Sequence, residues 1–480
     1  MLDGTLPAGD GAPHRGISLA GLLPGGRFIA CDDMPLRGCQ DAPARIRPGD
    51  LFVARLTSRG DGHDDVGQAI ARGATGVVAE RIVPTHGVPL CLVPDSGWAW
   101  GRLHHALAGE PARRLDVIAI AGTSGKTTTA WLTAAVLAEA GRSVGVLSDL
   151  GCVDGSSLDA TTEPYDRPAD LAAWFGRLAA TGCRHAVVEV SARAITEQAL
   201  AGVACGTVAV PSLAGDDSRA GGFIPDLLRP DGCLAVALDS PGGRRLATRV
   251  RRRLPESTVI GTGTAAGHVV GAVPVERSLF GQTFLLRTRD EVVPVSVDTP
   301  TACFVRDALV AAAVGLHHHL PLEVIARGLE AAGCVSGRVE RIDHGQDAAV
   351  FVDTPSSGHA VAATLGSLRR LTSGRLVVLV EQRLAERMGG TRFASRLGRW
   401  CDACLVVPPT LLDDDPGPGD RAAYRRVDRL LAGLGRGDCA VVLGAPRPRR
   451  PAATRFALGQ VVSGWLRVAH PPRWSGGRAA

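Results

Sequence analysis

The sequence predicts an α/β protein made of three domains, and two observations carry this prediction. Short apolar segments alternate with Ala/Leu-rich helical segments along most of the chain, as is typical of parallel sheets covered by helices. The chain also has 480 residues. Because chains of this length ordinarily form more than one hydrophobic core, several domains are expected. Apolar residues make up 45% of the chain and charged residues 21%, which is the composition of a folded globular protein.

The first predicted domain, a small α/β unit, spans residues 1–111. The segment LFVARL (51–56) is apolar enough for a strand, and DDVGQAIARGA (64–74) has helical spacing closed by glycine. The segment TGVVAE (75–80) is extended again, and the polar segment GEPARR (109–114) is predicted to be the linker that follows this domain.

The second predicted domain spans residues 112–335 and contains a doubly wound parallel sheet. Its first strand, LDVIAI (115–120), leads through a glycine-rich turn into an Ala/Leu-rich helix that ends before Gly141. Helical segments separate the further apolar strands, which are VGVLSD (144–149), HAVVEVS (185–191), GTVAVPS (206–212) and CLAVALD (233–239).

The third predicted domain spans residues 336–480 and is a Rossmann-like α/β unit. Its strands alternate with helices rich in arginine, alanine and leucine. The predicted strands lie in RIDHGQDAAVFVDT (341–354), GRLVVLVEQ (374–382), ACLVVPPT (403–410) and CAVVLGAP (439–446).

The segment IAGTSGKTTT (120–129) contains the only lysine of the chain, because the other 52 of its 53 basic residues are arginine. Gly122 and Gly125 allow the backbone to curl close to phosphate oxygens. Lys126 supplies a compact positive charge for the β- and γ-phosphates, and Thr127 offers a hydroxyl to Mg²⁺. The turn and the helix that follows therefore indicate a site for ATP and magnesium, which makes the second domain a P-loop ATPase domain.

The segment departs from the common pattern G-x-x-x-x-G-K-[ST], because Ile120 stands at the first glycine position. An ordinary strand–turn–helix connection is the structural alternative. The unique lysine favours the phosphate-binding interpretation, in which Lys126 is the catalytic residue. The predicted ATP-binding residues are Gly122, Thr123, Ser124, Gly125, Lys126, Thr127 and Thr128.

The segment GTSGKTTT (122–129) resembles the ATP loop of the Mur ligase family, ATP-dependent enzymes that add amino acids to UDP-N-acetylmuramoyl peptide precursors of the bacterial wall. Residues 47–80 are similar to the family's N-terminal uridine-nucleotide domain. HAVVEVSARAI (185–195) resembles the strand end that carries a magnesium-binding glutamate, and residues 300–342 resemble the junction of the central and C-terminal domains. The family's tripeptide synthetases look most similar.

The resemblance implies ATP and Mg²⁺ as cofactors, with magnesium held by Thr127 and Glu189. A glutamate at a strand end is also compatible with helix capping or ion pairing. The resemblance further implies a threonine-rich loop near the phosphates, formed here by Thr161 and Thr162. Contacts to a UDP-muramoyl peptide substrate are implied for Asp61, Gly62 and His63, and cell-wall synthesis proteins are possible partners.

The chain also departs from the family at positions that serve the ligation step. The family uses a second, carbamylated lysine to hold a second magnesium ion, and this chain has none. Arg193 stands where the family has histidine, and Asp217 replaces a histidine in the altered segment 212–217. The family's Asp-Tyr-Ala-His becomes Asp-Thr-Pro-Ser at 353–356. The ATP segment is thus intact, whereas the ligation segments are altered.

Three interpretations of function remain open from these observations. The first is an ATP-dependent carboxylate–amine ligase with a divergent substrate or mechanism. The second is a catalytically impaired ATP-binding paralogue that acts as a regulator or scaffold in cell-wall synthesis. The third and weakest is a P-loop ATPase without a ligation step. Amine-dependent turnover distinguishes the first two.

The net charge and the hydropathy of the chain bear on which partners it binds and in which cellular compartment it lies. The formal net charge is only +5 and is spread along the chain, so nucleic acid is not expected as a ligand. No apolar stretch is long enough to span a bilayer and no signal peptide is evident, so a reducing cytoplasm with free thiols is expected.

Three further groups are interpreted structurally. The pair Cys401 and Cys404 is predicted to mark a helix-to-strand junction rather than a zinc or redox site. The run His317–His319 is predicted to be a solvated helix end rather than a metal site. The arginines of RVRRRLPE (249–256) are predicted to form a solvated helix face.

Overall fold

The computed structural model describes residues 17–57, 60–154, 165–214, 218–265, 267–408 and 420–444. The chain divides into two compact units. The first comprises residues up to Pro111 together with Asp166–Gly176 and Arg193–Val203, and the second comprises the remainder, through to the C-terminus. The domain limits 1–111, 112–335 and 336–480 stay a prediction.

The first unit is built on a five-stranded sheet in the order β2-β9-β8-β5-β4. Strands β4, β5, β8 and β9 run parallel, and β2 joins the edge antiparallel. Buried side chains lie on both faces, with Val53 and Val78 in one cluster and Phe52 and Val77 in the other, because successive residues of a strand face opposite sides. The strands are β2 (Arg27–Ile29), β4 (Cys39–Gln40), β5 (Leu51–Val53), β8 (Gly76–Ala79) and β9 (Leu90–Leu92), with the short pairs β1 (Ile17–Ser18) with β3 (Pro35–Leu36) and β6 (Leu56–Thr57) with β7 (Gly60–Asp61).

Short helices lie around this sheet, together with one longer helix, α3. Asp95 caps the longer helix by accepting a hydrogen bond from the Trp98 backbone N–H at 2.8 Å. The predicted strands at 51–56 and 75–80 and the predicted helix at 64–74 are all present. The helices are α1 (Leu19–Leu22), η1 (Pro43–Arg45), η2 (Gly62–Asp65), α2 (Val66–Ala71) and α3 (Ser96–Leu107).

The second unit contains a ten-stranded sheet in the order β12-β11-β13-β10-β14-β15-β16-β17-β18-β19. The seven strands from β11 to β17 in this order run parallel. Five of them, β10, β11, β13, β14 and β15, were predicted, and β16 was not. An antiparallel strand at one edge, β12, and an antiparallel meander at the other, β17-β18-β19, were not predicted. The strands are β10 (Asp116–Ile120), β11 (Val144–Ser148), β12 (Gly151–Val153), β13 (His185–Glu189), β14 (Cys205–Val210), β15 (Leu228–Ala237), β16 (Thr258–Gly263), β17 (Val270–Ser278), β18 (Gly281–Arg287) and β19 (Val292–Val297).

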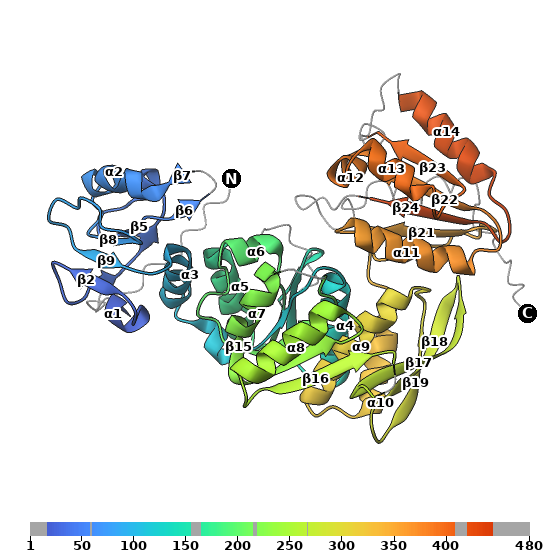
Figure 1. Ribbon diagram of the computed structural model, residues 1–480, viewed down its shortest axis with the longest axis horizontal. Helices are drawn as coiled ribbons and strands as arrows, with labels where there is room; N and C mark the ends of the chain where they lie inside the picture. Colours follow the sequence, from blue (N-terminus) through green and yellow to red (C-terminus); the bar gives the residue numbers. More distant parts are fainter. Residues whose placement is uncertain are drawn as a thin grey trace, which may run out of the picture. The chain divides into compact units, whose positions relative to one another are not determined.

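Helices α4 and α9 lie side by side against this sheet (Figure 1), and α10 packs beside them. Helix α9 is buried from Ala308 to Val314 because its apolar residues continue around the helix rather than along one stripe. The segment 109–114 contains the turn η3 (Pro111–Arg114). The helices are α4 (Lys126–Glu139), α7 (Ser218–Leu227), α8 (Pro241–Arg253), α9 (Ala302–His317) and α10 (Leu322–Ala331). Two further helices, α5 (Pro168–Ala180) and α6 (Ala192–Thr196), lie mostly in segments of the first unit.

The C-terminal part of the second unit has its own five-stranded sheet, in the order β20-β21-β24-β22-β23. Its four predicted strands pair in parallel, and β20 adds an antiparallel edge. One face packs against α11, α12 and α13, and the other against α14, as the predicted Rossmann-like unit requires. The elements are β20 (Glu340–Ile342), β21 (Ala349–Asp353), α11 (Gly358–Leu371), β22 (Leu376–Glu381), α12 (Gln382–Arg387), α13 (Thr391–Leu397), β23 (Ala403–Val407), α14 (Asp420–Ala432) and β24 (Cys439–Leu443).

The histidine run at the end of α9 differs from its prediction. His319 is exposed, but the side chain of His318 is only 11% exposed because it packs against the rings of His185 and His317. The prediction of a solvated helix end is therefore wrong for His318. The predicted helix-to-strand junction is present, since Cys401 lies between α13 and β23 and Cys404 is the second residue of β23.

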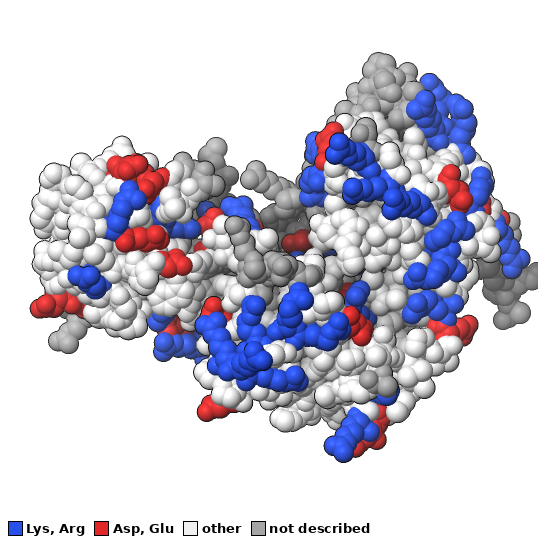
Figure 2. Space-filling model, in the orientation of Figure 1, with Lys and Arg blue, Asp and Glu red and all other residues white. Residues whose placement is uncertain are grey.

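The arginines of α8 are exposed, as predicted, and Figure 2 shows them gathered over this helix. Ser240 caps the helix at its N-terminus through the Gly243 backbone N–H, and Leu246 and Val250 bury its other face. Across the described ranges, no helix has the length and apolar character that crossing a bilayer requires.

Candidate functional site

The glycine-rich turn between β10 and α4 has a conformation that its two glycines make possible. Gly122 has φ of 136° and Gly125 has φ of 80°, a region that other residues adopt rarely. Space is equally tight, since a Cβ on Gly122 would lie 2.4 Å from the Ser212 carbonyl oxygen. A Cβ on Gly125 would lie 2.3 Å from Asp307 Oδ1. The backbone therefore wraps closely at the N-terminus of α4, where helix N–H groups attract anions.

The predicted ATP-binding residues divide into two groups in the structure. Thr123 is held against the end of β14, because its N–H donates to the Ser212 carbonyl at 2.9 Å and its hydroxyl accepts from the Ala214 N–H at 3.2 Å. Gly122 lies beside the same segment. The others line a pocket of the second unit, and they are Ser124, Gly125, Lys126, Thr127 and Thr128.

Glu189 ends β13, the strand next to β10, and its carboxylate reaches the same pocket. The Thr127 hydroxyl donates to Glu189 Oε2 at 2.9 Å, and the Asp149 N–H donates to the same oxygen at 3.1 Å. Lys126 Nζ lies 3.8 Å from Glu189 Oε1. Thr127 and Glu189 therefore lie in direct contact in this pocket, and their joint role as magnesium ligands stays a proposal.

The environment of Glu189 favours a cation. The residue is only 8% exposed, and this burial, together with the neighbouring Asp149, raises the pKa of its carboxyl group. Lys126 and Arg338 oppose this shift with their positive charges. The Thr127 hydroxyl and the Glu189 carboxylate are oxygen ligands of the kind that Mg²⁺ prefers, so the residues present fit that ion.

Arg338 is a functional candidate that the sequence reasoning missed. It lies just before β20, and its guanidinium donates hydrogen bonds to the Thr127 hydroxyl at 2.8 Å and to the Thr354 hydroxyl at 2.8 Å. The pocket thus has a second cation, carried on a different segment from Lys126. It lies in the region 300–342 that resembles the family's domain junction, but nothing in one sequence distinguishes this arginine from the 51 others.

Two buried carboxyl groups complete the pocket and were also not predicted as site residues. Asp353 ends β21 and accepts a hydrogen bond from the Thr364 hydroxyl at 2.9 Å, while burial raises its pKa. Asp307, on α9, is 5% exposed, and burial raises its pKa to about 8 in spite of Arg306 and Arg338 nearby. At neutral pH Asp307 is therefore mainly protonated and adds no negative charge beside the glycine-rich turn.

Replacing Asp307 by asparagine is expected to stabilise the protein increasingly as pH rises. The folded-state pKa of about 8 exceeds the ordinary value, so the folded state binds this proton more tightly than the unfolded state. Wild-type stability should consequently fall as pH rises from about 4 to about 8, by up to about 1.4 kcal/mol per unit. The D307N protein lacks this loss, and we expect the stability difference to grow by more than about 1 kcal/mol between pH 5 and pH 8.

Denaturant unfolding at several pH values measures this difference. The matched control is D290N, which changes an exposed aspartate outside the pocket. A constant difference between D307N and wild type across this interval would show that Asp307 is ionised in the folded protein.

The predicted substrate residues Asp61, Gly62 and His63 lie in the first unit, at β7 and η2. His63 Nε2 accepts a hydrogen bond from the Glu80 N–H at 3.1 Å, so Nδ1 carries the proton and donates to Asp61 Oδ1 at 2.6 Å. Asp61 also pairs with Arg81 at 2.8 Å. These contacts give His63 a structural function, and substrate contact by the three residues stays a prediction.

The other residues named from the sequence either lie outside the described residues or belong to the first unit. Thr161 and Thr162 lie outside the described residues, as does Asp217. Arg193 lies on α6 and belongs to the first unit. The Thr161–Thr162 loop and the part of Arg193 in the chemistry therefore stay predictions.

A parallel strand, a tight glycine turn and a helix that begins with lysine, all at the carboxyl edge of the sheet, define an α/β protein of the P-loop type. Residues 120–216 match the Mur ligase middle domain. The chain is 31% identical over 360 residues to the UDP-N-acetylmuramoyl-L-alanyl-D-glutamate–2,6-diaminopimelate ligase of Corynebacterium efficiens, which covers 71% of this chain and 67% of that protein. This chain belongs to the Mur ligase family.

Further similarities extend over nearly the whole chain. The enzyme of the same name from Geobacillus thermodenitrificans is 26% identical over 430 residues, 87% of this chain and 86% of the relative. A solved structure of such a diaminopimelate ligase superposes with a TM-score of 0.66 at 16% identity and covers 95% of this chain and 99% of its own. The MurF ligase from Thermotoga maritima in complex with ADP gives 0.55 at 17% identity, with 90% and 98% covered. The three-domain α/β fold predicted from the sequence is confirmed.

Proposed function

We propose that this chain binds ATP with magnesium in the pocket at the N-terminus of α4 and uses it to join an amino acid to a carboxylate of a UDP-muramoyl peptide. The observation that carries the proposal is the meeting of Thr127 and Glu189 beside Lys126 in the phosphate-binding turn. The diaminopimelate ligases to which the chain is similar are named for this class of reaction.

The side chains of the pocket would serve different functions in binding Mg·ATP, according to their chemistry. Lys126 and the N–H groups at the start of α4 attract the phosphates, and Arg338 brings a second set of donors to the same place. Thr127 and Glu189 would hold magnesium, which supplies positive charge against the phosphate oxygens when bound. Asp307, protonated at neutral pH, avoids repelling them.

The reaction that this arrangement supports has two transfers. The substrate carboxylate takes the γ-phosphoryl group from ATP, which gives an acyl phosphate and ADP. The amine of the amino acid then attacks the acyl carbon, an amide forms, and inorganic phosphate leaves. The protein contributes alignment of the reactants and stabilisation of developing charge.

We propose that this ligation is slow, because the chain has no second lysine to supply the carbamylated group that the family resemblance implies. The same observation favours a second candidate function, in which the chain binds ATP without ligation and regulates or scaffolds cell-wall synthesis. A cytoplasmic location fits both functions, since all twelve cysteines are free.

Phosphate release tests the proposal. Purified protein with Mg·ATP is assayed with and without a UDP-muramoyl dipeptide and with a panel of amino acids that includes diaminopimelate, and amide product is measured by mass spectrometry. Release that depends on both acceptor and amine supports the ligase. Nucleotide binding without phosphate release supports the function as a regulator. Phosphate release that is independent of both the acceptor and the amine indicates a simple ATPase.

Replacing Glu189 by glutamine is expected to weaken binding of Mg·ATP about 10- to 100-fold, the range found when groups that support a metal are removed. Binding of ATP without magnesium should change less or even improve, because a carboxylate repels phosphates when no cation lies between them. Calorimetric titrations in magnesium and in EDTA measure both affinities. The exposed Glu323, changed to glutamine, is the matched control. Equal effects of E189Q in both buffers would leave Glu189 with a structural role.

A further inference from the structure

Three side chains with metal-binding chemistry meet at the edge of the sheet opposite to the nucleotide pocket. Asp116 begins β10 and His185 begins β13, and the two residues are paired in register on these neighbouring parallel strands. His318 directly follows α9. The pocket residues Lys126 and Glu189 follow the carboxyl ends of the same two strands, so this second group is separate from the pocket.

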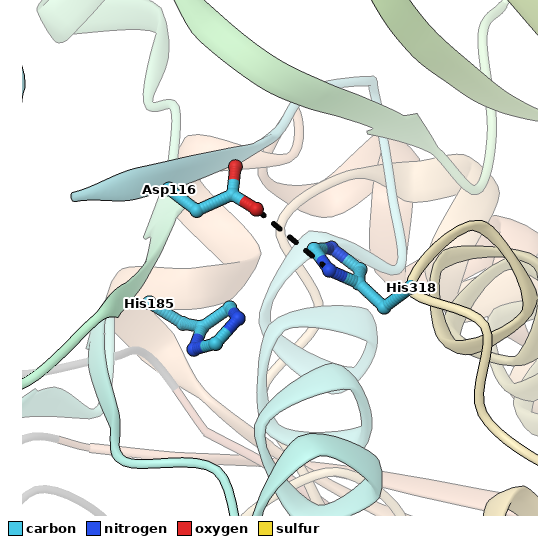
Figure 3. A group of neighbouring side chains, drawn as sticks. All are labelled: Asp116, His185 and His318. Atoms are coloured by element: carbon cyan, nitrogen blue, oxygen red, sulfur yellow. Dashed lines mark ion pairs between the residues drawn. The ribbon is translucent and has the colours of Figure 1, made fainter.

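The three side chains point toward one another (Figure 3). Each offers one possible ligand atom, and these atoms all lie within 4.8 Å of one another. His318 Nδ1 lies 3.7 Å from Asp116 Oδ2, and the rings of His185 and His318 meet edge to face at 5.5 Å. Asp116 is 37% exposed and His318 11% exposed, so an ion can reach the group from solvent.

We propose that Asp116, His185 and His318 bind a divalent transition metal, with Zn²⁺ as the best fit. Two imidazoles and one carboxylate form a ligand set that suits zinc, and three protein ligands leave a fourth position for water. Mg²⁺ prefers oxygen ligands and fits this group poorly. Around a zinc ion, tetrahedral ligand atoms lie roughly 3.5 Å apart, so the three ligand atoms, which lie within 4.8 Å of one another, need to approach by at most about 1.3 Å.

The surrounding contacts leave these ligand positions available. His318 Nε2 is buried and has no hydrogen-bond partner in the part of the chain that the structure describes. His185 Nδ1 faces the Ser143 carbonyl oxygen at 3.4 Å, an arrangement that orients an imidazole for binding metal through its other nitrogen.

An ion pair between Asp116 and His318 does not explain the group equally well. His318 Nδ1 and Asp116 Oδ2 are 3.7 Å apart, which is too long for a hydrogen bond between them. Such a pair would also leave out His185, whose ring meets that of His318 edge to face.

A metal ion bound by these three residues would stabilise the folded chain by linking three of its segments. It would link the first residues of β10 and β13 to the end of α9, whose buried part runs from Asp307 in the nucleotide pocket to Gly315. Binding to the folded state alone raises stability. The expected role is therefore structural, and it does not depend on the reaction at the pocket.

Zinc titration of the metal-stripped full-length protein tests the proposal. We expect one zinc ion to bind the wild type and to raise its unfolding temperature. The variants D116N and H318Q should each lose about tenfold or more in zinc affinity. The matched control is H319N, which changes the adjacent exposed histidine, whose φ of 58° asparagine tolerates. Wild-type affinity in both D116N and H318Q, or no tight zinc site in the wild type, would overturn the proposal.

Cobalt(II) substitution of the wild type makes the test independent of how the variants fold. A site with nitrogen and oxygen ligands gives visible d–d bands without the intense near-ultraviolet band of a thiolate bound to cobalt. The chain has twelve free cysteines, and a strong thiolate band from the tight site would show that they, rather than this group, hold the ion.

Discussion

Replacing Lys126 by alanine is expected to weaken ATP binding about 30- to 1000-fold while leaving the fold intact. Lys126 is 15% exposed and lies at the start of α4, where its ammonium faces the pocket and the Glu189 carboxylate. Losing a largely desolvated contact between this charge and the phosphates should cost about 2–4 kcal/mol. Since no other lysine exists in the chain, none can take its place.

Calorimetry measures this loss, with thermal unfolding to confirm that the variant is folded. Changing Lys126 to arginine is a second useful variant, because the broad guanidinium does not fit inside the wrapped turn and should also bind ATP weakly. Changing the exposed Arg251 of α8 to alanine is the matched control and should leave the affinity unchanged. Wild-type affinity in a folded K126A protein would refute the assignment of this residue.

Ligation of a UDP-muramoyl dipeptide to an amino acid is expected to proceed near the limit of detection. The chain lacks the second lysine, and it has Arg193 and Asp217 where the family resemblance implies histidines. Each missing electrostatic contact to developing charge is worth roughly 10²–10³ in rate. The losses need not add, because groups that act together are not independent.

Steady-state product formation measures this rate, and an active diaminopimelate ligase from a relative serves as the positive control under the same conditions. A rate near ~10 s⁻¹, typical of ordinary enzymes, would show that the altered residues do not impair the chemistry. Restoring histidine at Arg193 should raise a residual ligation rate if the substituted position limits it, and should leave Mg·ATP affinity unchanged.

The parallel core of the fold was predictable because its strands are short, continuously apolar and separated by helices. Strands β10, β13 and β14 are buried on both faces, so almost every residue is apolar and the pattern is clear. The meander β17-β18-β19 was missed because β17 and β19 expose many side chains to solvent and contain proline. Their pairing arises from contacts between strands, which a local pattern does not reveal.

The candidate site was predictable where its chemistry is local in the sequence. The turn and Lys126 are contiguous, and Glu189 follows an apolar strand. Asp307 and Arg338 were missed because they reach the pocket from distant segments and have ordinary neighbours in the chain. The burial of His318 was missed for the same reason, since two of its contacts, Asp116 and His185, come from the distant strands β10 and β13.

Titration of ATP into the wild-type protein, once with magnesium and once with EDTA, tests the central claim most directly. The proposed site predicts a single ATP per chain whose affinity falls at least about tenfold when magnesium is removed, because Glu189 then faces the phosphates without a cation between them. Absence of ATP binding, or equal affinity in the two buffers, would contradict a magnesium–ATP site built from Lys126, Thr127 and Glu189.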